Sequence, residues 1–527
     1  MVAKKYKSVI QTGLPKETQS LCPECKKIIK ARIFEENGDV MMEKECKEHG
    51  KFKDRYWSDA KYYLWAEQYA YDGDGIKNPR TQYTTDCPGN CGICNEHKSH
   101  TVLANLDLTN RCNLQCPVCF ANANEAGYVY EPSYEQVVEM MVNLRANRPV
   151  TTPAIQLSGG EPTVYPRFFD VVRKARELGF AQVQVATNGI KIAKDPNYAN
   201  KMKEAGVQTV YLQFDGLREQ NYIDARGKPL LKTKLKAIEN LRNTKGKPLS
   251  TVLVPTIING INDDQCGEIL KFAIENRDVI RCVNYQPVAF TGRIDREELK
   301  SQRFTISDLA DRLEKQTNFV KKYDFYPVPF VAPISYLASV VSGKDKVNFT
   351  SHPHCGVATF LFIDDNNNVT PINRFVDVDG MLGKMNQMSD RASGFLAQAL
   401  LKVGRKVKSN KSRTKAVLKS FDKYFGEFID YDKIPEGLNL NEIITGLIAT
   451  GDRQPLSDFT WNLLMVGGMH FQDGYNYDIE RVKRCVIHYA VPDGRIIPFC
   501  AYNGGPQYRD EIEKKFSVPL SEWKKNH

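Results

Sequence analysis

The chain of 527 residues lacks any uninterrupted apolar run long enough to cross a bilayer, which argues against a membrane-spanning helix. Its first residues, MVAKKYKS, are charged and polar and contain no apolar core, so we do not expect a secretory signal peptide. No internal repeat is evident, and the only strongly biased tract is a basic one. We therefore expect a cytoplasmic protein made of several globular domains.

Cysteine, by contrast, is abundant, because the chain contains fourteen. Disulfides are rare in cytoplasmic proteins, so this number favours metal ligation. Thiolate–iron chemistry on this scale would be sensitive to oxygen, and we expect an anaerobic source.

Three of the cysteines lie close together in the string LTNRCNLQCPVCFANA, at Cys112, Cys116 and Cys119. This spacing puts three thiolates on one tight loop, enough for three irons of a [4Fe–4S] cluster, and leaves the fourth iron open to bind a small molecule. A structural zinc ion is the alternative interpretation, but zinc would need a fourth ligand nearby.

Short apolar strands alternate with amphipathic helices after this loop. We expect strands near residues 102–108, 154–157, 183–187, 208–215, 251–256 and 281–288. Ser133 and Gln136 form a candidate capping box at the start of one helix, and Gly179 is expected to end another. The repeated strand–helix pattern predicts an α/β fold with a parallel sheet and a ligand site at the strand ends.

The second of these strands ends in Ser158-Gly159-Gly160-Glu161-Pro162. Together with the CxxxCxxC loop, this string resembles the radical S-adenosylmethionine (SAM) superfamily. The resemblance implies a partial (β/α)6 barrel of the TIM type, a [4Fe–4S] cluster on the three loop cysteines, and a GGEP string that holds the methionine end of SAM. Polar residues at other strand ends or in an early helix are further candidates for SAM contacts: Asn188, Gln213, Arg226 and Thr256.

The N-terminal segment carries a second metal pattern, Cys22 and Cys25 followed by Cys46 and His49. Two such pairs about twenty residues apart are typical of a mononuclear metal site. Between the pairs we expect two strands joined by a turn at Asn37-Gly38-Asp39. The pattern looks like a zinc ribbon or a rubredoxin-like knuckle, and it does not choose between zinc and iron.

The remaining cysteines predict two auxiliary iron–sulfur clusters. Cys87, Cys91 and Cys94 are spaced for three corners of one cluster, with His97, His100 or a distant cysteine as the fourth ligand. Because this group shortly precedes Cys112, we expect the two clusters to be neighbours in space. For the second auxiliary cluster we favour Cys355, Cys485 and Cys500, completed by Cys282 or Cys266, and the alternative is that these are buried apolar thiols.

The whole chain resembles one archaeal family of radical SAM enzymes, which includes the tetraether lipid synthase and proteins described as pterin methylases. The matching strings are CPEC with CKEHG, CPGNCGIC before CNLQCPVCF, LSGGEPT, ATNG, YLQFDG and the late cysteines. The resemblance implies that a 5′-deoxyadenosyl radical abstracts hydrogen and that C–C bonds form between terminal methyl carbons of isoprenoid chains in archaeal diether lipids. Auxiliary clusters would pass electrons or trap the first alkyl radical. A radical SAM methylase acting on a pterin is the alternative, and the GGEP string argues against a non-enzymatic electron carrier.

This interpretation carries expectations about partners. They are a diether phospholipid substrate and an electron donor such as ferredoxin or flavodoxin, with no nucleic acid. Residues 402–423 are strongly basic and follow an apolar stretch at 395–401, which suits peripheral contact with an anionic membrane, although nucleic acid or a solvated loop would also explain it. Apolar segments at 331–341 and 461–469 are candidates for a lipid channel or for core helices.

The motifs divide the chain into four expected regions. These are a metal knuckle at 1–60, a linker with a cluster segment at 61–100, the partial barrel at 101–325, and an α+β region for substrate and auxiliary cluster at 326–527.

Overall fold

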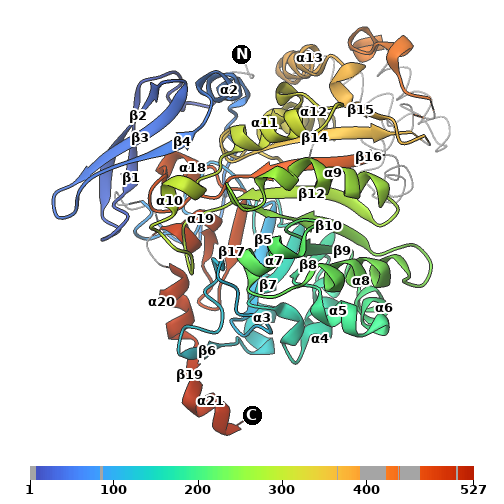
Figure 1. Ribbon diagram of the computed structural model, residues 1–527. Helices are drawn as coiled ribbons and strands as arrows, with labels where there is room; N and C mark the ends of the chain where they lie inside the picture. The colour runs from blue at the N-terminus through green and yellow to red at the C-terminus, as the bar shows by residue number, and fades with distance from the viewer. Residues whose placement is uncertain are drawn as a thin grey trace.

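The computed structural model describes residues 8–82, 87–342, 344–364, 366–391, 423–436, 438, 463–505 and 508–526. Within them lie a four-stranded sheet, a thirteen-stranded sheet and a two-stranded sheet (Figure 1). The apolar stretch at 395–401 and the basic run up to residue 422 lie outside the described residues. Among the described helices, none combines the length and the apolar character needed to cross a bilayer.

Six parallel strands form the centre of the large sheet, each paired with the next. They are β5 (Leu103–Thr109), β7 (Ala154–Gly159), β8 (Gln182–Thr187), β9 (Thr209–Gln213), β10 (Ser250–Val254) and β12 (Ile280–Pro287). This confirms the predicted partial barrel, because all six expected strands form and pair in parallel.

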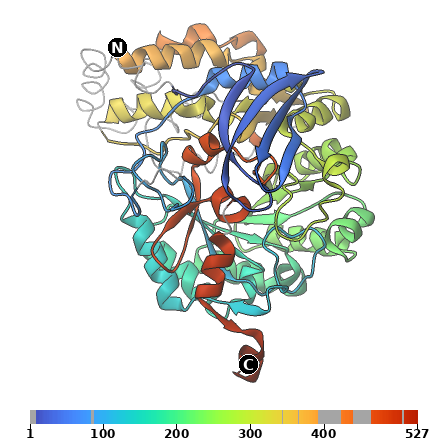
Figure 2. The same cartoon turned by 90° about the vertical axis from the view of Figure 1, so that its left-hand side faces the viewer.

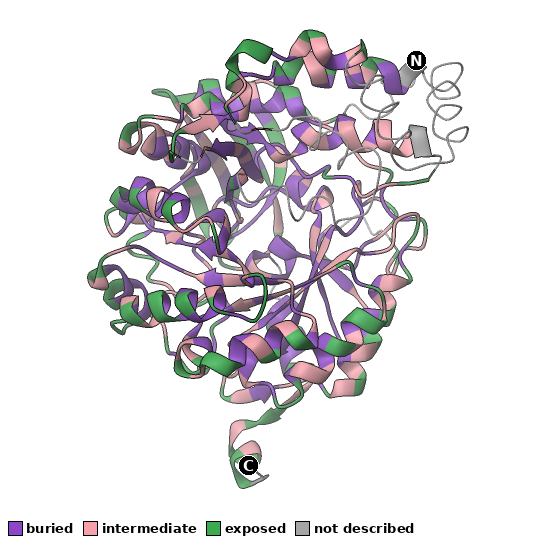
Figure 3. Cartoon of the chain, turned by 90° about the vertical axis from the view of Figure 1, so that its right-hand side faces the viewer, coloured by how far each residue is buried: buried purple, intermediate pink, exposed green. Residues whose placement is uncertain are grey.

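Amphipathic helices cover the outside of this barrel and turn their buried residues toward the strands (Figure 3). They are α3 (Tyr134–Arg145), α4 (Phe168–Glu177), α6 (Pro196–Ala205), α7 (Glu219–Arg226), α8 (Leu231–Arg242) and α9 (Cys266–Glu275), with the short α5 (Ile190–Lys194). The predicted capping box is present, because the Gln136 amide donates to Ser133 Oγ at 3.2 Å and the Ser133 amide donates to Gln136 Oε1 at 2.8 Å. Gly179 follows α4 with φ of +80°, as a helix stop requires.

Strands from the last part of the chain extend the barrel at both edges. On one edge β16 (Leu463–Met469) pairs in parallel with β12, and β14 (Gly356–Ile363) pairs antiparallel with β16. On the other edge β17 (Ile487–Ala490) pairs in parallel with β5, and β18 (Ile496–Pro498) pairs antiparallel with β17.

The apolar segment at 461–469 is not a core helix, since its described part is the sheet strand β16. An apolar run this short fits either a strand or a helix by periodicity alone. The strand packs tightly against its neighbours, because a Cβ at Gly468 would come within 2.6 Å of the Leu309 side chain. The other apolar segment forms the helix α12 (Ala332–Ser342).

The N-terminal sheet is an antiparallel meander of β1 (Lys16–Leu21), β2 (Ile28–Glu36), β3 (Asp39–Cys46) and β4 (Gly50–Trp57). Asn37 and Gly38 both have positive φ, 57° and 88°, which is the turn expected between β2 and β3. The sheet lies against the flank of the barrel, in front of the C-terminal segment (Figure 2). Arg303 joins the two parts, because its guanidinium pairs with Asp54 on β4 and with Asp473 after β16.

Three short strands complete the large sheet: β11 (Thr256–Ile257), which pairs with β12, and β13 (Tyr326–Pro327) and β15 (Val369–Pro371), which pair with β14. The two-stranded sheet consists of β6 (Tyr128–Tyr130) and β19 (Ser517–Pro519). The other described α-helices are α2 (Ala60–Ala66), α10 (Leu299–Gln302), α11 (Ile306–Gln316), α13 (Val378–Arg391), α18 (Ile479–Lys483), α19 (Phe499–Gly504), α20 (Tyr508–Lys515) and α21 (Leu520–Asn526).

Candidate functional site

A cavity of about 270 Å³ opens at the carboxyl ends of the barrel strands. All three cysteines of the predicted cluster loop line it. So do most of the residues predicted to contact SAM, namely Gly159, Gly160, Asn188, Gln213, Arg226 and Thr256. The structure therefore brings these predicted residues to one cavity, and their contact with SAM stays a prediction.

The cluster loop is held in shape by side chains that bind its backbone. Asn124 receives a hydrogen bond from the Cys112 amide at 3.0 Å and donates one to the Cys112 carbonyl at 2.9 Å. Arg293 donates from Nε to the Cys116 carbonyl at 2.7 Å, and its backbone pairs with Cys119 in both directions. Arg293 lies far from the loop in sequence, outside any motif, and sequence analysis missed it.

The loop thiols fit an iron cluster chemically. Burial raises the pKa of Cys112 to about 12, and the nearby carboxylate of Glu161 adds to the shift. Burial also raises the pKa of Cys116. Thiolates are costly at such a site unless a cation accepts them, and bound iron is such a cation.

Gly159 and Gly160 allow the end of β7 to cross the backbone of the cluster loop. A Cβ at Gly159 would lie 2.3 Å from the Thr109 carbonyl oxygen, and one at Gly160 would lie 2.3 Å from that of Arg111. The Gly160 amide donates to the Thr109 oxygen at 2.7 Å. We expected the absence of a side chain at these glycines to leave room for a ligand. In the structure it leaves room for the backbone of Thr109 and Arg111, directly before the first cysteine of the cluster loop.

Glu161 does not offer its carboxylate to the cavity. It is 1% exposed and accepts hydrogen bonds from Thr163 Oγ1 at 2.6 Å, Thr187 Oγ1 at 2.8 Å and the Asn188 amide at 2.8 Å. Glu161 therefore ties the end of β7 to the end of β8. It positions the site, and neither it nor Pro162 lines the cavity.

Arg226 was expected to bind a ligand carboxylate, but its guanidinium already has one. It forms two hydrogen bonds of 2.8 Å with Asp215 and donates to the Val118 carbonyl at 2.9 Å and to Thr256 Oγ1 at 2.9 Å. Burial alone would lower the pKa of Arg226, but Asp215 raises it overall. Arg226 thus links the end of β9 to the cluster loop.

Lys234 on α8 is a buried positioning residue that sequence analysis also missed. Its ammonium donates to the Asn188 carbonyl at 2.6 Å and to Gln213 Oε1 at 2.8 Å. Burial lowers its pKa to about 8. Because Lys234 occupies the Gln213 oxygen, the amide nitrogen of Gln213 is the group left to bind a ligand in the cavity.

The four predicted N-terminal ligands come together as one compact group. Their ligand atoms all lie within 4.8 Å of one another. Cys25 Sγ is 3.8 Å from Cys46 Sγ, and His49 Nδ1 is 3.5 Å from Cys46 Sγ and 3.7 Å from Cys22 Sγ. A tetrahedral ion with bonds of about 2.3 Å would place its ligands about 3.8 Å apart, so this set fits a mononuclear ion held by three cysteines and a histidine.

The late cysteines Cys355, Cys485 and Cys500 also approach one another. Cys355 and Cys500 both act on the pKa of Cys485, which burial raises. Cys87 and Cys91 of the second group pack against the same hydrophobic cluster as Cys485 and Cys500, so the structure places this group beside the late cysteines. The expected proximity to Cys112 stays a prediction.

The residues predicted as fourth ligands of the two auxiliary clusters either lie in the core or form hydrogen bonds with other groups. Cys282 lies in the central strand β12. Cys266 is the first residue of α9 and belongs to the main hydrophobic core. Burial raises the pKa of both thiols. Both behave as buried apolar residues, and the described contacts do not bring them to Cys355. His97 Nε2 contacts the Cys485 carbonyl at 2.8 Å, and His100 Nε2 accepts from the Asn348 amide at 3.0 Å.

Comparison with known families assigns the central part of the chain. The profile of the Radical SAM superfamily matches residues 106–273, which contain the cluster loop and the GGEP string. The chain belongs to this superfamily. As a radical SAM protein it uses SAM and a [4Fe–4S] cluster, and a second profile, the HMPTM N-terminal zinc ribbon domain, matches residues 14–58.

One curated relative matches this radical SAM protein over its full length. It is 46% identical over 98% of this chain and 98% of its own length, and it is named 7,8-dihydro-6-hydroxymethylpterin dimethyltransferase, from Methanocaldococcus jannaschii. The chain and this relative form one family. A probable GTP 3′,8-cyclase from the same organism is 24% identical over 44% of the chain and 75% of its own length.

Solved structures give a weaker likeness. The crystal structure of methylornithine synthase covers 42% of this chain and 64% of that chain, at 15% identity and a TM-score of 0.31. A structure of TYW1 with a lysine-pyruvate adduct covers 56% and 87%, at 15% identity and a TM-score of 0.28. These scores are too low to support an argument about this radical SAM protein.

Replacing Lys234 with methionine is expected to weaken SAM binding about tenfold, the effect of losing one hydrogen bond of about 1.4 kcal/mol. Gln213 and Asn188 would lose the cation that orients them. Calorimetric titration of the cluster-loaded protein with SAM measures the effect. Lys232→Met is the matched control, because Lys232 lies on the same helix and is exposed. Equal affinities for the two variants would contradict a positioning role.

Replacing Cys46 with serine is expected to release one metal ion per chain and to lower the thermal unfolding temperature. The ligand set would lose a thiolate that holds both ends of the ribbon together. Elemental analysis and thermal unfolding under anaerobic conditions measure both effects, and recovered zinc would distinguish a zinc site from iron. Glu45→Ser is the control, since Glu45 is exposed beside Cys46. Unchanged metal content in Cys46→Ser would exclude this site.

Proposed function

We propose that this chain is a radical SAM methylase that acts on a reduced pterin, 7,8-dihydro-6-hydroxymethylpterin or a close analogue. The observation that carries the proposal is the relative of that name, which is 46% identical over almost the entire chain. Identity at this level extends beyond the barrel, through the zinc ribbon and the late cysteines, so it covers the parts that distinguish one radical SAM enzyme from another.

This proposal replaces the expectation of lipid coupling. The tetraether interpretation and its diether phospholipid substrate rested on resemblance alone, and the full-length relative carries the name of a pterin enzyme. Of the two apolar segments that were candidates for a lipid channel or for core helices, one is largely the sheet strand β16 and the other forms the helix α12. A pterin also needs only a small polar pocket.

We propose Cys112, Cys116 and Cys119 as the ligands of the [4Fe–4S] cluster. When bound, this cluster and SAM supply a carbon radical that removes hydrogen from unactivated carbon atoms. Gly159 and Gly160 bring the end of β7 against the loop, and Gln213 and Thr256 offer polar groups to SAM from neighbouring strand ends. Asn188 contributes mainly structure, because its side chain already bonds Asn113 at 2.6 Å.

The floor of the cavity supports a polar heterocycle. Asn105 lines it, is 1% exposed, and has an amide nitrogen without a hydrogen-bond partner among the described residues. Its oxygen accepts from Gln156 at 2.9 Å, and Gln156 accepts in turn from Gln184 at 2.7 Å. An amide donor buried without a partner costs free energy, which a pyrimidine ring carbonyl or nitrogen would recover by accepting the bond.

The test is an anaerobic reaction of the reconstituted full chain with SAM, dithionite and the dihydropterin, followed by mass spectrometry. Each added methyl group needs a one-carbon donor, so the reaction is run once with excess SAM alone and once with an added methylene-tetrahydropterin. We expect 5′-deoxyadenosine in both and a pterin heavier by one or two methyl groups in at least one. A parallel reaction contains an archaeal diether phospholipid in place of the pterin, and we expect that lipid to stay unchanged. Untouched pterin beside SAM cleavage, or coupled lipid, would overturn the proposal.

A further inference from the structure

Arg481 differs from the other buried arginines of the described residues. Four of the five form ion pairs with carboxylates: Arg226 with Asp215, Arg303 with Asp54 and Asp473, Arg484 with Asp72 and Glu480, and Arg509 with Asp107 and Glu513. Arg481 is 1% exposed and pairs with none among the described residues. A buried guanidinium without a counter-charge is unfavourable, so the site calls for another source of negative charge.

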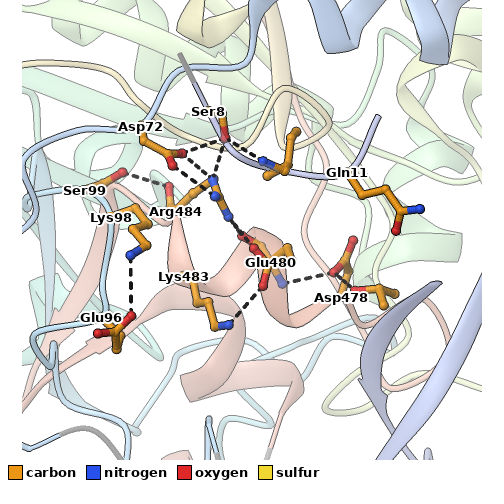
Figure 4. A network of polar contacts seen from close by, with 12 residues as sticks. Ser8, Gln11, Asp72, Glu96, Lys98, Ser99, Asp478, Glu480, Lys483 and Arg484 are labelled. Carbon is orange, nitrogen blue, oxygen red and sulfur yellow. Dashed lines mark hydrogen bonds and ion pairs between the residues drawn. The ribbon is translucent and has the colours of Figure 1, made fainter. Parts of the chain in front are cut away.

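The contrast is sharpest with Arg484, one turn further along and equally buried. Figure 4 shows Arg484 inside a network of acidic side chains. Its guanidinium is 2.6 Å from Asp72 and 2.6 Å from Glu480. Carboxylates therefore neutralise the buried charge of Arg484, whereas no carboxylate among the described residues pairs with Arg481.

Arg481 is directed at a cysteine instead. Its Nε donates to Cys355 Sγ at 3.4 Å, one Nη donates to the His470 carbonyl, and the other Nη has no partner among the described residues. Cys500 Sγ is nearby as well, because it accepts from the amide of Gln472, two residues after the His470 carbonyl that Arg481 bonds. Among the described groups that accept hydrogen bonds from Arg481, only the Cys355 sulfur can thus become negatively charged.

Two further observations connect these thiols to the cavity. The Gln472 amide donates to Cys500 Sγ at 3.4 Å, and Gln472 itself lines the cavity. Phe499, directly before Cys500, stacks on Phe471 at 4.1 Å between ring centroids, and both rings line the cavity. The cysteine group therefore borders the site where substrate chemistry is proposed to occur.

We propose that Cys355, Cys485 and Cys500 ligate an iron–sulfur cluster and that Arg481 is its counter-charge. A cluster held by thiolates is anionic, which removes the cost of burying Arg481. A cation and an N–H donor beside a ligand sulfur favour the reduced state, so Arg481 raises the reduction potential of this cluster. The position beside the cavity suits a one-electron exchange with a substrate-derived radical, whichever substrate is used. The inference does not depend on the pterin.

The test is a redox titration of the anaerobically reconstituted full chain, followed by electron paramagnetic resonance, with iron analysis. The relevant signal is the one that disappears in Cys355→Ala, which should also lose about four irons per chain. Arg481→Gln should keep the iron but shift the midpoint potential of that signal to more negative values. Arg481→Lys, which keeps the charge, should shift it less and in the same direction.

The matched control is Glu480→Gln, which alters the network of Arg484 and leaves the contacts of Arg481 in place. Its midpoint potential should stay at the wild-type value. Unchanged iron in Cys355→Ala would overturn the cluster, and an unchanged potential in Arg481→Gln would overturn the role of Arg481. If Arg481→Gln does not fold, Arg481→Met, which also removes the charge, is titrated in its place, and a potential equal to that of the wild type would then overturn the role.

Discussion

Replacing Gly160 with alanine is expected to reduce the formation of 5′-deoxyadenosine about a hundredfold, the scale of loss that a displacement near 1 Å produces at a reacting centre. The added Cβ would lie 2.3 Å from the Arg111 oxygen and 2.8 Å from the Asn110 oxygen. Both contacts are with backbone, so the cluster loop or the end of β7 must move. The measurement is the rate of SAM cleavage under reducing conditions, together with iron content.

Gly383→Ala is the matched control. Gly383 lies in α13 and is exposed, and apart from its chain neighbours and its own helix backbone no described atom lies within 4 Å of the position that a Cβ would take. Its SAM cleavage should equal that of the unchanged chain. A Gly160→Ala variant that is equally active would show that the close crossing of loop and strand is not required.

The second large effect is on stability. Arg303→Met is expected to destabilise the chain by about 3–5 kcal/mol, since it leaves the buried carboxylates Asp54 and Asp473 without their shared cation. Although burial opposes ionisation, Arg303 lowers the pKa of Asp473 to about 2. A shift of the urea midpoint, measured anaerobically on metal-loaded protein, tests the prediction.

Arg32→Met provides the comparison, because Arg32 pairs with Glu43 on the exposed face of the ribbon. A surface pair of this kind contributes about 0–1 kcal/mol. If the two variants unfolded at the same urea concentration, the buried pair would not be what attaches the ribbon to the barrel.

The sequence predicted most reliably those features that local chemistry determines. The capping box at Ser133, the turn at Asn37-Gly38 and the positions of the six barrel strands each depend on local sequence patterns, and the structure confirms them. The N-terminal ligand set was also predictable, because CxxC and CxxH pairs fix the geometry of a small metal site.

Features that depend on contacts between distant segments were not predictable in the same way. Lys234 and Arg293 shape the cavity from positions that carry no motif, and Arg226 and Glu161 are occupied by partners that only the folded chain brings near. Composition could not show that 463–469 inserts between β12 and β14 as a strand. The division of the chain into four regions stays a prediction.

The pairing of β17 with β5 has a consequence for how the protein is made. Ile487 lies opposite Leu103, so the first barrel strand leaves the ribosome long before its outer neighbour has been synthesised. Until then one edge of the growing barrel is unpaired and open to wrong partners. Cys485, beside β17, approaches Cys355 only when that edge closes, so the iron–sulfur cluster proposed at this position would be inserted after β17 has been synthesised. Biogenesis would therefore end with the metal centre that lies nearest the C-terminus.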